Sequence, residues 1–302
     1  MRSHAYTLAR AAAAPHSAGL AEYLELAKPR ITTMVAATAW VGCELGRLPG
    51  QAVPWVPTLA AVTGTALACA SAGVFNQVIE RDSDALMHRT RHRPLPTGRI
   101  SVAAASLYGW GLASAALLIL ATFTNALAAL LAALTIGGYL FIYTPLKRRA
   151  GISTLVGAVP GAMPPVIGYA AVTGTLAIPA LAVFAIMFLW QLPHFLAIAW
   201  LYREDYARAG MPMLPVIDPS GASTFRQMVV GCMALLPVGL WPAAIGLAGA
   251  AYFWGALALG LVFLATGLVL VVRRSTRWAR VMFYTSLVYL PGILGLLLVN
   301  RG

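Results

Sequence analysis

The chain has 302 residues, of which 60% are hydrophobic and only 10% are charged. A soluble domain carries about 25% charged residues, so this chain has too little charge to cover a water-exposed surface of its size. The net charge of +12 does not indicate nucleic-acid binding, because the basic residues fall between apolar runs and not along one stripe. We therefore expect a protein that lies in the lipid bilayer and binds no nucleic acid.

The first 21 residues contain arginines, serines and alanines but no acidic residue. This composition fits an organelle-targeting peptide as well as an ordinary basic tail. The segment lacks the amphipathic arginine pattern of a targeting peptide, which favours the tail. We expect residues 1–21 to form a disordered tail and residues 22–302 to form a single polytopic domain.

Nine apolar runs are each long enough to cross a bilayer as a helix. Helices are expected because strands with open edges would leave backbone groups without hydrogen bonds in lipid. Prolines interrupt several runs, and neighbouring helices can bind the carbonyl groups that those prolines leave free. The approximate ranges are 28–46, 56–79, 101–122, 126–144, 152–172, 178–201, 227–247, 251–272 and 281–299. The sequence thus predicts an all-α integral membrane protein, a bundle of nine transmembrane helices.

The basic residues divide unevenly between the two sides of this bundle. Of the 21 Lys and Arg residues, all except Arg47 and Arg301 lie on the side of the N-terminus. Cytoplasmic loops carry such an excess, so we expect the N-terminus in the cytoplasm and the C-terminus outside. The same side holds two long connections, 80–100 and 202–226, with six of the nine acidic residues. Long charged loops on one side indicate that the chemistry takes place there.

The first long connection begins with three oxygen-bearing side chains at helical spacing, Asn76, Glu80 and Asp84. On an α-helix such positions lie within about 80° of one another, along about 12 Å of axis. Ionisable groups at the end of a membrane span are costly unless they are used. Mg²⁺ binds oxygen ligands, commonly one or two carboxylates with water and phosphate oxygens. This oxygen trio therefore predicts a magnesium site, whereas Asp82 is out of phase and should point elsewhere.

Arginines follow the oxygen trio directly. Arg89 and Arg93 are candidates for binding phosphate, because guanidinium groups bind phosphate oxygens through two parallel hydrogen bonds. The excess of basic residues on the inner side explains arginines here as well, but it does not explain the trio. Carboxylates that hold a metal, followed by arginines that hold phosphate, indicate a diphosphate site. Its catalytic candidates are Asn76, Glu80, Asp84, Arg89 and Arg93.

Several strings in the sequence resemble one enzyme family. The oxygen trio resembles the first aspartate-rich motif of the UbiA superfamily of intramembrane prenyltransferases. The string ERDSDALMHRTRHRPLPTGRI, from Glu80, is similar to the protohaem IX farnesyltransferases within that superfamily. Further similar strings are AKPRI from Ala27, YTPLKRR from Tyr143 and WQLPHFLAIAWLYREDYARAGMPMLP from Trp190. The resemblance covers most of residues 22–299 and implies a nine-helix bundle whose central cavity opens near the cytoplasmic side.

The resemblance also implies an activity, a cofactor and partners. Such an enzyme uses Mg²⁺ and transfers a farnesyl group from farnesyl diphosphate to a vinyl group of haem B, which gives haem O for respiratory oxidases. Haem A synthase or oxidase assembly proteins are the protein partners it suggests. The implied location is a bacterial inner membrane, with the mitochondrial inner membrane as the alternative. Lys28, Arg30, Lys147 and Arg148 match strings of the family and would help to bind the diphosphate.

The connection after the sixth span holds candidates for a second site. Many UbiA-type enzymes carry a second aspartate-rich motif there, which binds another Mg²⁺. The positions that align with its spaced aspartates are Tyr202 and Tyr206 in this chain, a departure that leaves a second metal open. Glu204 or Asp205 could still contribute. A charged helix end with interfacial tyrosines explains each residue alone, but as a set opposite the first motif they predict substrate binding.

His194 lies inside the sixth span, about two turns before this loop. Polar groups within a span are costly and usually have a use. The resemblance implies that His194 contacts the substrate, and imidazole is a common ligand of haem iron. A hydrogen bond to another helix explains the residue equally well, so the sequence leaves both readings open.

Three other functions compete with this interpretation. A UbiA-type transferase that acts on a quinone precursor or another aromatic acceptor would have a similar first site, but the strings RTRHRPLP and PHF favour haem. A transporter would place ionisable residues near the middle of the membrane and often shows internal repeats. Here the acidic residues cluster at the inner ends of the second and sixth spans. A structural assembly partner of a respiratory oxidase would not need the oxygen trio.

Overall fold

The computed structural model describes residues 18–147 and 153–301. Most of the predicted tail lies outside these ranges. The first helix, α2 (Leu20–Leu26), includes the last two residues of the predicted tail. The cause is local, because the Glu22 carboxylate accepts a hydrogen bond from the backbone N–H of Gly19 at 3.0 Å and caps the helix.

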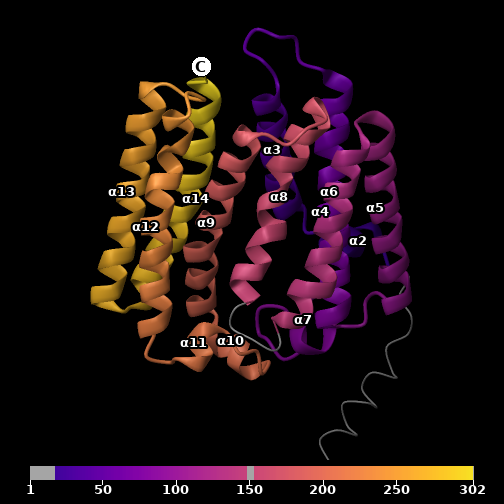
Figure 1. The fold of residues 1–302 in the computed structure, drawn as a ribbon. Coiled ribbons are helices and arrows are strands. Elements are labelled where there is room, and N and C mark those ends of the chain that lie inside the picture. The colour runs from indigo at the N-terminus through magenta and orange to yellow at the C-terminus, as the bar shows by residue number, and fades with distance from the viewer. Residues whose placement is uncertain (1–17, 148–152, 302) are drawn as a thin grey trace, which may run out of the picture.

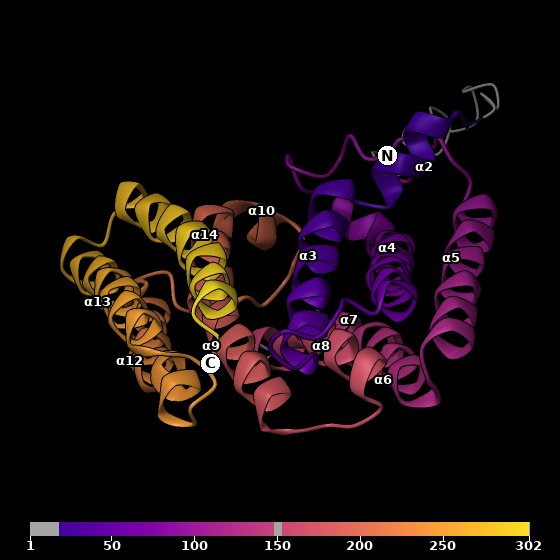
Figure 2. The same cartoon turned by 90° about the horizontal axis from the view of Figure 1, so that it is seen from above.

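Long helices occupy all nine predicted spans. They are α3 (Pro29–Gly46), α4 (Trp55–Asp84), α5 (Val102–Phe123), α6 (Ala126–Gly137) continued by η1 (Gly138–Tyr143) and α7 (Thr144–Leu146), α8 (Ser153–Thr173), α9 (Ile178–Leu201), α12 (Ala222–Ala244), α13 (Ala250–Arg273) and α14 (Thr276–Val299). Within the described ranges, eight of these are long and apolar enough to cross a membrane. The exception is α3, which includes several threonines and Glu44. The all-α membrane bundle is therefore confirmed, and the ninth span rests on the position of α3 among the other helices (Figure 2).

Three helices extend beyond their predicted limits, always at the end that carries the charged residues. Helix α4 continues to Asp84 instead of residue 79, α12 begins at Ala222 instead of 227, and α14 begins at Thr276 instead of 281. The apolar runs end where lipid ends, whereas the helices continue into the polar interface. The extension of α4 matters most, because it keeps the whole oxygen trio on one helix.

The two ends of the bundle differ. The short helices α10 (Arg203–Arg208) and α11 (Leu214–Ile217) lie at one end, with the loop after α4, and the C-terminus lies at the other (Figure 1). Seen along the bundle, α12, α13 and α14 form one group and α4, α5 and α6 another, with α8 and α9 connecting them (Figure 2). The charged connections therefore gather at a single end, as their sequence predicts.

Helices α3 and α8 pack backbone against backbone. A Cβ atom at Gly42 would lie 1.9 Å from the carbonyl oxygen of Pro165, and one at Gly168 would lie 1.9 Å from that of Ala39. Small residues allow such close approach between helices in a membrane. This contact fixes the position of α3, whose first turn adjoins the oxygen trio.

Candidate active site

The oxygen trio lies on one face at the inner end of α4 and is buried. Asn76, Glu80 and Asp84 have relative exposures of 5%, 2% and 1%. The side chain of Asp82 is 80% exposed and pairs with its neighbour Arg81. The helical spacing therefore separates the buried acids from the exposed one, as predicted.

Each member of the oxygen trio accepts hydrogen bonds from a different cation. These cations come from three separate segments: the start of α3, the end of α7 and the loop after α4. Lys28 Nζ donates to Asn76 Oδ1 at 3.2 Å, Lys147 Nζ to both Glu80 oxygens at 3.0 Å, and Arg93 Nη1 to Asp84 Oδ2 at 2.7 Å. The fold thus brings together three of the predicted phosphate-binding residues at the predicted metal ligands.

Lys28 is held in a strained backbone conformation. It is the N-cap of α3, with a φ of 50° in the left-handed region, and Pro29 follows it as the first residue of the helix. Non-glycine residues in this region cost about 1–3 kcal/mol and cluster at functional sites. The conformation directs the amine toward Asn76.

Lys147 is positioned by the π-helix η1. A π-helical turn changes the phase of the following residues and often occurs at functional sites. The rings of Tyr139 and Tyr143 on this segment lie 5.0 Å apart, and the ammonium of Lys147 reaches Glu80. Burial acts against the charged form of Lys147, but the surroundings, which include the Glu80 carboxylate, raise its pKa overall. Lys147 therefore forms a buried ion pair with Glu80.

Replacing Lys147 with Met should destabilise the protein, because Glu80 would keep a buried charge without its partner. Breaking a buried ion pair costs about 3–5 kcal/mol. We expect a lower Tm for Lys147→Met in detergent, measured by the change in tryptophan fluorescence on heating. The double variant Lys147→Met with Glu80→Gln should recover most of the lost stability. A Lys147→Met protein that melts with the parent would show that the pair contributes nothing to the fold.

The trio offers oxygen atoms of the kind that magnesium binds. Asp84 Oδ1 and Asn76 Nδ2 are buried and have no hydrogen-bond partner among the described residues. An unpaired buried carboxylate oxygen is costly, and a cation would satisfy it. No cluster of three or more His, Cys, Asp and Glu side chains occurs in the described ranges, so the set consists of two carboxylates and one amide. Mg²⁺ accepts such a set when phosphate and water complete it.

Asp205 joins the two charged connections. Its Oδ1 accepts from the backbone N–H of His88 at 3.0 Å, its Oδ2 from that of Arg89 at 3.4 Å, and Arg208 donates to it as well. Burial acts to raise the pKa of Asp205, but these hydrogen bonds lower it overall. The carboxylate therefore fastens the loop after α4 onto α10.

Arg89 lies on two tyrosine rings. Its guanidinium carbon is 4.5 Å from the ring centre of Tyr202 and 5.7 Å from that of Tyr206, and its Nη2 donates to the Tyr206 hydroxyl at 3.3 Å. Cation–π contacts of this kind hold a guanidinium in place without neutralising its charge. The two connections thus meet at a fixed arginine.

Comparison with known proteins places this geometry in a family. The sequence profile of the UbiA prenyltransferase family matches residues 35–288. The chain belongs to this family. The protoheme IX farnesyltransferase of Solibacter usitatus is 47% identical to it, over 93% of this chain and 98% of the relative. That of Salinibacter ruber is 44% identical, over 92% of this chain and 98% of the relative.

Solved structures share the UbiA fold at low sequence identity. A structure of digeranylgeranylglyceryl phosphate synthase matches with a TM-score of 0.77 at 16% identity, covering 93% of this chain and 98% of that one. A UbiA homolog from Archaeoglobus fulgidus, bound to DMAPP and Mg²⁺, matches with a TM-score of 0.65 at 17% identity, covering 91% and 99%. These likenesses establish the architecture of the bundle.

Two of the predicted site residues, Arg30 and Glu204, make no contact with the trio. Arg30 and Glu204 are exposed, and the side chain of neither forms a hydrogen bond or ion pair with another described residue. Each lies in the first turn of its helix. Arg148 lies outside the described residues. A role for these three in this UbiA protein is a prediction without structural support.

His194 belongs to α9, and its side chain contacts α14. It takes no part in the hydrogen bonds of the trio. Its Nδ1 is 2.7 Å from Ser286 Oγ, and its ring stacks between Trp190 and Phe283. The Ser286 hydroxyl donates to the carbonyl of Phe283, so its oxygen accepts from Nδ1–H of His194. Nε2 then carries the lone pair and has no hydrogen-bond partner among the described residues. The predicted hydrogen-bond partner on another helix is therefore Ser286 of α14. The lone pair of Nε2 is still available to haem iron.

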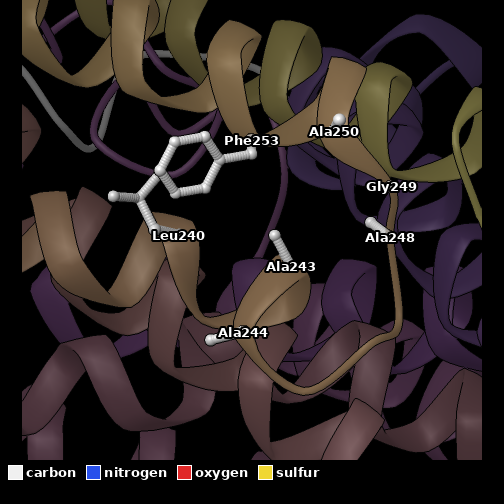
Figure 3. A pocket seen from close by; sticks show the side chains of 7 residues that line it. All are labelled: Leu240, Ala243, Ala244, Ala248, Gly249, Ala250 and Phe253. Atoms are coloured by element: carbon white, nitrogen blue, oxygen red, sulfur yellow. The ribbon is translucent and has the colours of Figure 1, made fainter.

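Two cavities in the described part of this UbiA bundle can be compared with the site. One of about 160 Å³ is lined by Lys147, Tyr143 and Tyr206, together with apolar side chains of α9 such as Phe195. A wider one of about 340 Å³ lies at the opposite end between α12 and α13 and is lined by Leu240, Phe253, alanines and Gly249 (Figure 3). Size alone would favour the wider cavity. The smaller cavity carries the charged group and fits the expected opening near the inner end.

Sequence reasoning missed Tyr139, Tyr143 and Ser286. The two tyrosines and Lys147 are spaced four residues apart, the same spacing as the oxygen trio, and this signal could have found them. Ser286 gave no signal, because a serine in an apolar span usually hydrogen-bonds its own helix. Its importance appears only once α14 packs against α9.

Proposed function

We propose that this chain transfers a farnesyl group from farnesyl diphosphate to a vinyl group of haem B. The observation that carries the proposal is the buried oxygen trio with a cation on each member, at the end of the bundle where the charged loops gather. Relatives named protoheme IX farnesyltransferase, matched over nearly the whole chain, support the prenyl donor and the porphyrin acceptor.

The residues of the site bind the diphosphate and make it a better leaving group. Asn76, Glu80 and Asp84 would hold Mg²⁺, which when bound would withdraw charge from the phosphate oxygens. Lys147 and Arg93 are close enough to these ligands to donate to the same diphosphate. The unpaired N–H group of Asn76 is a further donor. These charges favour departure of the diphosphate with the electron pair of the C1–O bond.

Apolar and aromatic side chains control what happens to the farnesyl group. As the C1–O bond breaks, C1 gains allylic cation character, and the rings of Tyr139 and Tyr143 can stabilise nearby positive charge. Phe195, Ile198 and Ala199 line the adjoining cavity and exclude water from C1. The vinyl π electrons of haem B then form the new C–C bond. Water adds to the resulting porphyrin cation and loses a proton, which leaves a hydroxyethylfarnesyl group.

The direct test is to incubate the purified protein with haem B, farnesyl diphosphate and Mg²⁺ and to identify the porphyrin by mass. We expect a product heavier by one farnesyl group and one hydroxyl group. Recovery of haem B alone would contradict the proposal. Prenylation of an added quinone precursor in place of haem would establish the alternative acceptor.

We further propose that the protein lies in the bacterial inner membrane, with the end that carries α10 and α11 in the cytoplasm. The excess of basic residues at this end supports the orientation. Haem A synthase or oxidase assembly proteins remain the expected protein partners. Single cysteines introduced at exposed Arg277 and Leu48, in a background without the three native cysteines, should react with an impermeant reagent from opposite sides of the membrane. Reaction of both from one side would refute this topology.

Ligation of haem iron by His194 has a spectroscopic test. Because Ser286 fixes Nδ1 as the protonated nitrogen, Nε2 is the atom that would bind iron. We expect bound haem to show an imidazole-ligated absorbance spectrum that His194→Ala abolishes and Ser286→Ala broadens or shifts. The matched control is His92→Ala, which removes an exposed imidazole. An unchanged spectrum in His194→Ala would remove the ligation and leave His194 a link between α9 and α14.

A further inference from the structure

We propose that this site binds a single divalent metal ion, and that the Arg89 guanidinium, fixed by Tyr202 and Tyr206, supplies the second positive centre for the diphosphate. The inference rests on the proposed function, because it concerns the same substrate. In this proposal, Tyr202 and Tyr206 of the second long connection (202–226, here the second loop) hold a cation in position.

The second loop has no carboxylate free to bind a metal at the site. Both oxygens of Asp205 accept hydrogen bonds, and Arg208 also pairs with it. Glu204 points outward and is exposed. Magnesium is usually bound through one or two carboxylates, and the remaining carboxylate of this connection, Asp218, accepts hydrogen bonds from Ser220 and from the backbone N–H of Ser223. The ligands for one ion are therefore present on α4, and those for another are absent from the described part of the second loop.

Arg89 differs from the other cations of the site in its pairing. Lys28, Lys147 and Arg93 each donate to a member of the oxygen trio. The guanidinium of Arg89 instead contacts two neutral tyrosines, and its one side-chain hydrogen bond among the described residues goes to the Tyr206 hydroxyl. A guanidinium carries five N–H donors, so most of them are available to an anion. Its positive charge is not cancelled by a carboxylate.

The backbone at Arg89 is held as firmly as its side chain. Asp205 accepts from the N–H groups of His88 and Arg89. Met87, two residues before Arg89, is buried in an apolar cluster with Tyr206, Met211 and Met213. A charge that is already positioned stabilises developing charge without reorganisation during the reaction. The surroundings of Arg89 are therefore arranged to keep one cation in one place.

The position of Tyr206 connects Arg89 to the trio. Tyr206 and Lys147 both line the cavity of about 160 Å³, and Lys147 pairs with Glu80. Arg89 donates to the hydroxyl of the same Tyr206. A diphosphate in this cavity would contact Lys147, the partner of Glu80, and Tyr206, the partner of Arg89. Two positive centres would then flank the leaving group, as its charge requires.

The number of metal ions per protein tests the proposal without catalysis. The purified full-length protein is equilibrated with Mn²⁺ and a farnesyl diphosphate analogue whose C1–O bond is replaced by a non-cleavable C–C bond. Free and bound Mn²⁺ are then counted by electron paramagnetic resonance. We expect one Mn²⁺ per protein at saturation. Two bound ions would overturn the inference.

Variants test the part assigned to Arg89. Arg89→Gln should weaken binding of the analogue about tenfold or more, because charge-assisted hydrogen bonds to phosphate are lost. The matched control Arg91→Gln removes an exposed guanidinium that hydrogen-bonds His92 and should leave the affinity unchanged. Equal affinity of Arg89→Gln and the parent, with equal Tm values, would overturn the assignment. Tyr202→Leu together with Tyr206→Leu should reproduce the loss, and Tyr202→Phe alone should not.

The outcome is separable from that of the proposed function. A protein that forms the prenylated porphyrin but binds two Mn²⁺ ions overturns the single-metal inference alone. A protein that binds one Mn²⁺ with the analogue but prenylates no porphyrin overturns the proposed acceptor and leaves the inference in place.

Discussion

Replacing Asp84 with Ala should lower the rate of farnesyl transfer by about three orders of magnitude. Asp84 offers the one carboxylate oxygen of the oxygen trio that has no partner among the described residues, and its other oxygen positions Arg93. A metal ion contributes several kcal/mol to charge stabilisation in the transition state, and about 4 kcal/mol corresponds to a factor of 10³ in rate. Glu80→Gln should cause a similar loss. Product formation is measured by mass with saturating substrates.

The control for this experiment lies in the same helix turn. Asp82→Asn removes a carboxylate of the same kind, two residues from Asp84, but its side chain is 80% exposed and pairs with Arg81. We expect Asp82→Asn to keep the parent rate. Size-exclusion profiles in detergent establish that every variant is inserted and folded. An Asp84→Ala protein with nearly the parent rate would exclude Asp84 from metal binding.

Replacing Gly168 with Ala should prevent the chain from accumulating as a folded protein. The added Cβ would lie 1.9 Å from the carbonyl oxygen of Ala39 and 3.1 Å from the backbone nitrogen of Cys43. Overpacking costs about 1–3 kcal/mol where side chains can adjust, but here the obstacle is backbone, so α3 itself must move. Its first residue follows Lys28, and displacement of α3 would therefore also disturb the contact with Asn76.

Each variant is fused to a fluorescent protein and passed over a size-exclusion column in detergent, where the effect is measured as loss of the monodisperse peak. Gly111→Ala in α5 is the matched control, because no atom within 4 Å would meet its Cβ. Alanine favours helix over glycine by about 1 kcal/mol, so Gly111→Ala should express at least as well as the parent. A monodisperse Gly168→Ala protein with the parent's Tm would show that α3 and α8 can separate freely.

Much of this architecture could be predicted because its physical causes are local. A run of about 20 apolar residues has few alternatives to a membrane helix, and the positions of the long helices follow these runs. The oxygen trio could be predicted for the same reason, since a spacing of four residues determines which side chains share a helical face. Burial of Glu80 beside exposure of Asp82 is the direct consequence.

Features that depend on contacts between distant segments could not be predicted. Asp205 fastens a loop 117 residues earlier in the chain, and no local pattern identifies the N–H groups that it binds. For Arg30 and Glu204, sequence similarity indicated a function, but the outward direction of their side chains is decided by the helix turn in which each lies.

The cation on each member of the oxygen trio has a consequence for the order of loading. Lys28, Lys147 and Arg93 balance the trio while no substrate is bound, so an incoming divalent ion competes with charges of its own sign. A diphosphate offers these three cations new hydrogen-bond acceptors. The carboxylates of Glu80 and Asp84 are then free to bind the metal ion. Ion affinity should therefore be weak for the protein alone and rise with the anionic donor. The enzyme would then bind the divalent ion and the prenyl diphosphate together, as one complex. The protein without substrate would hold little metal.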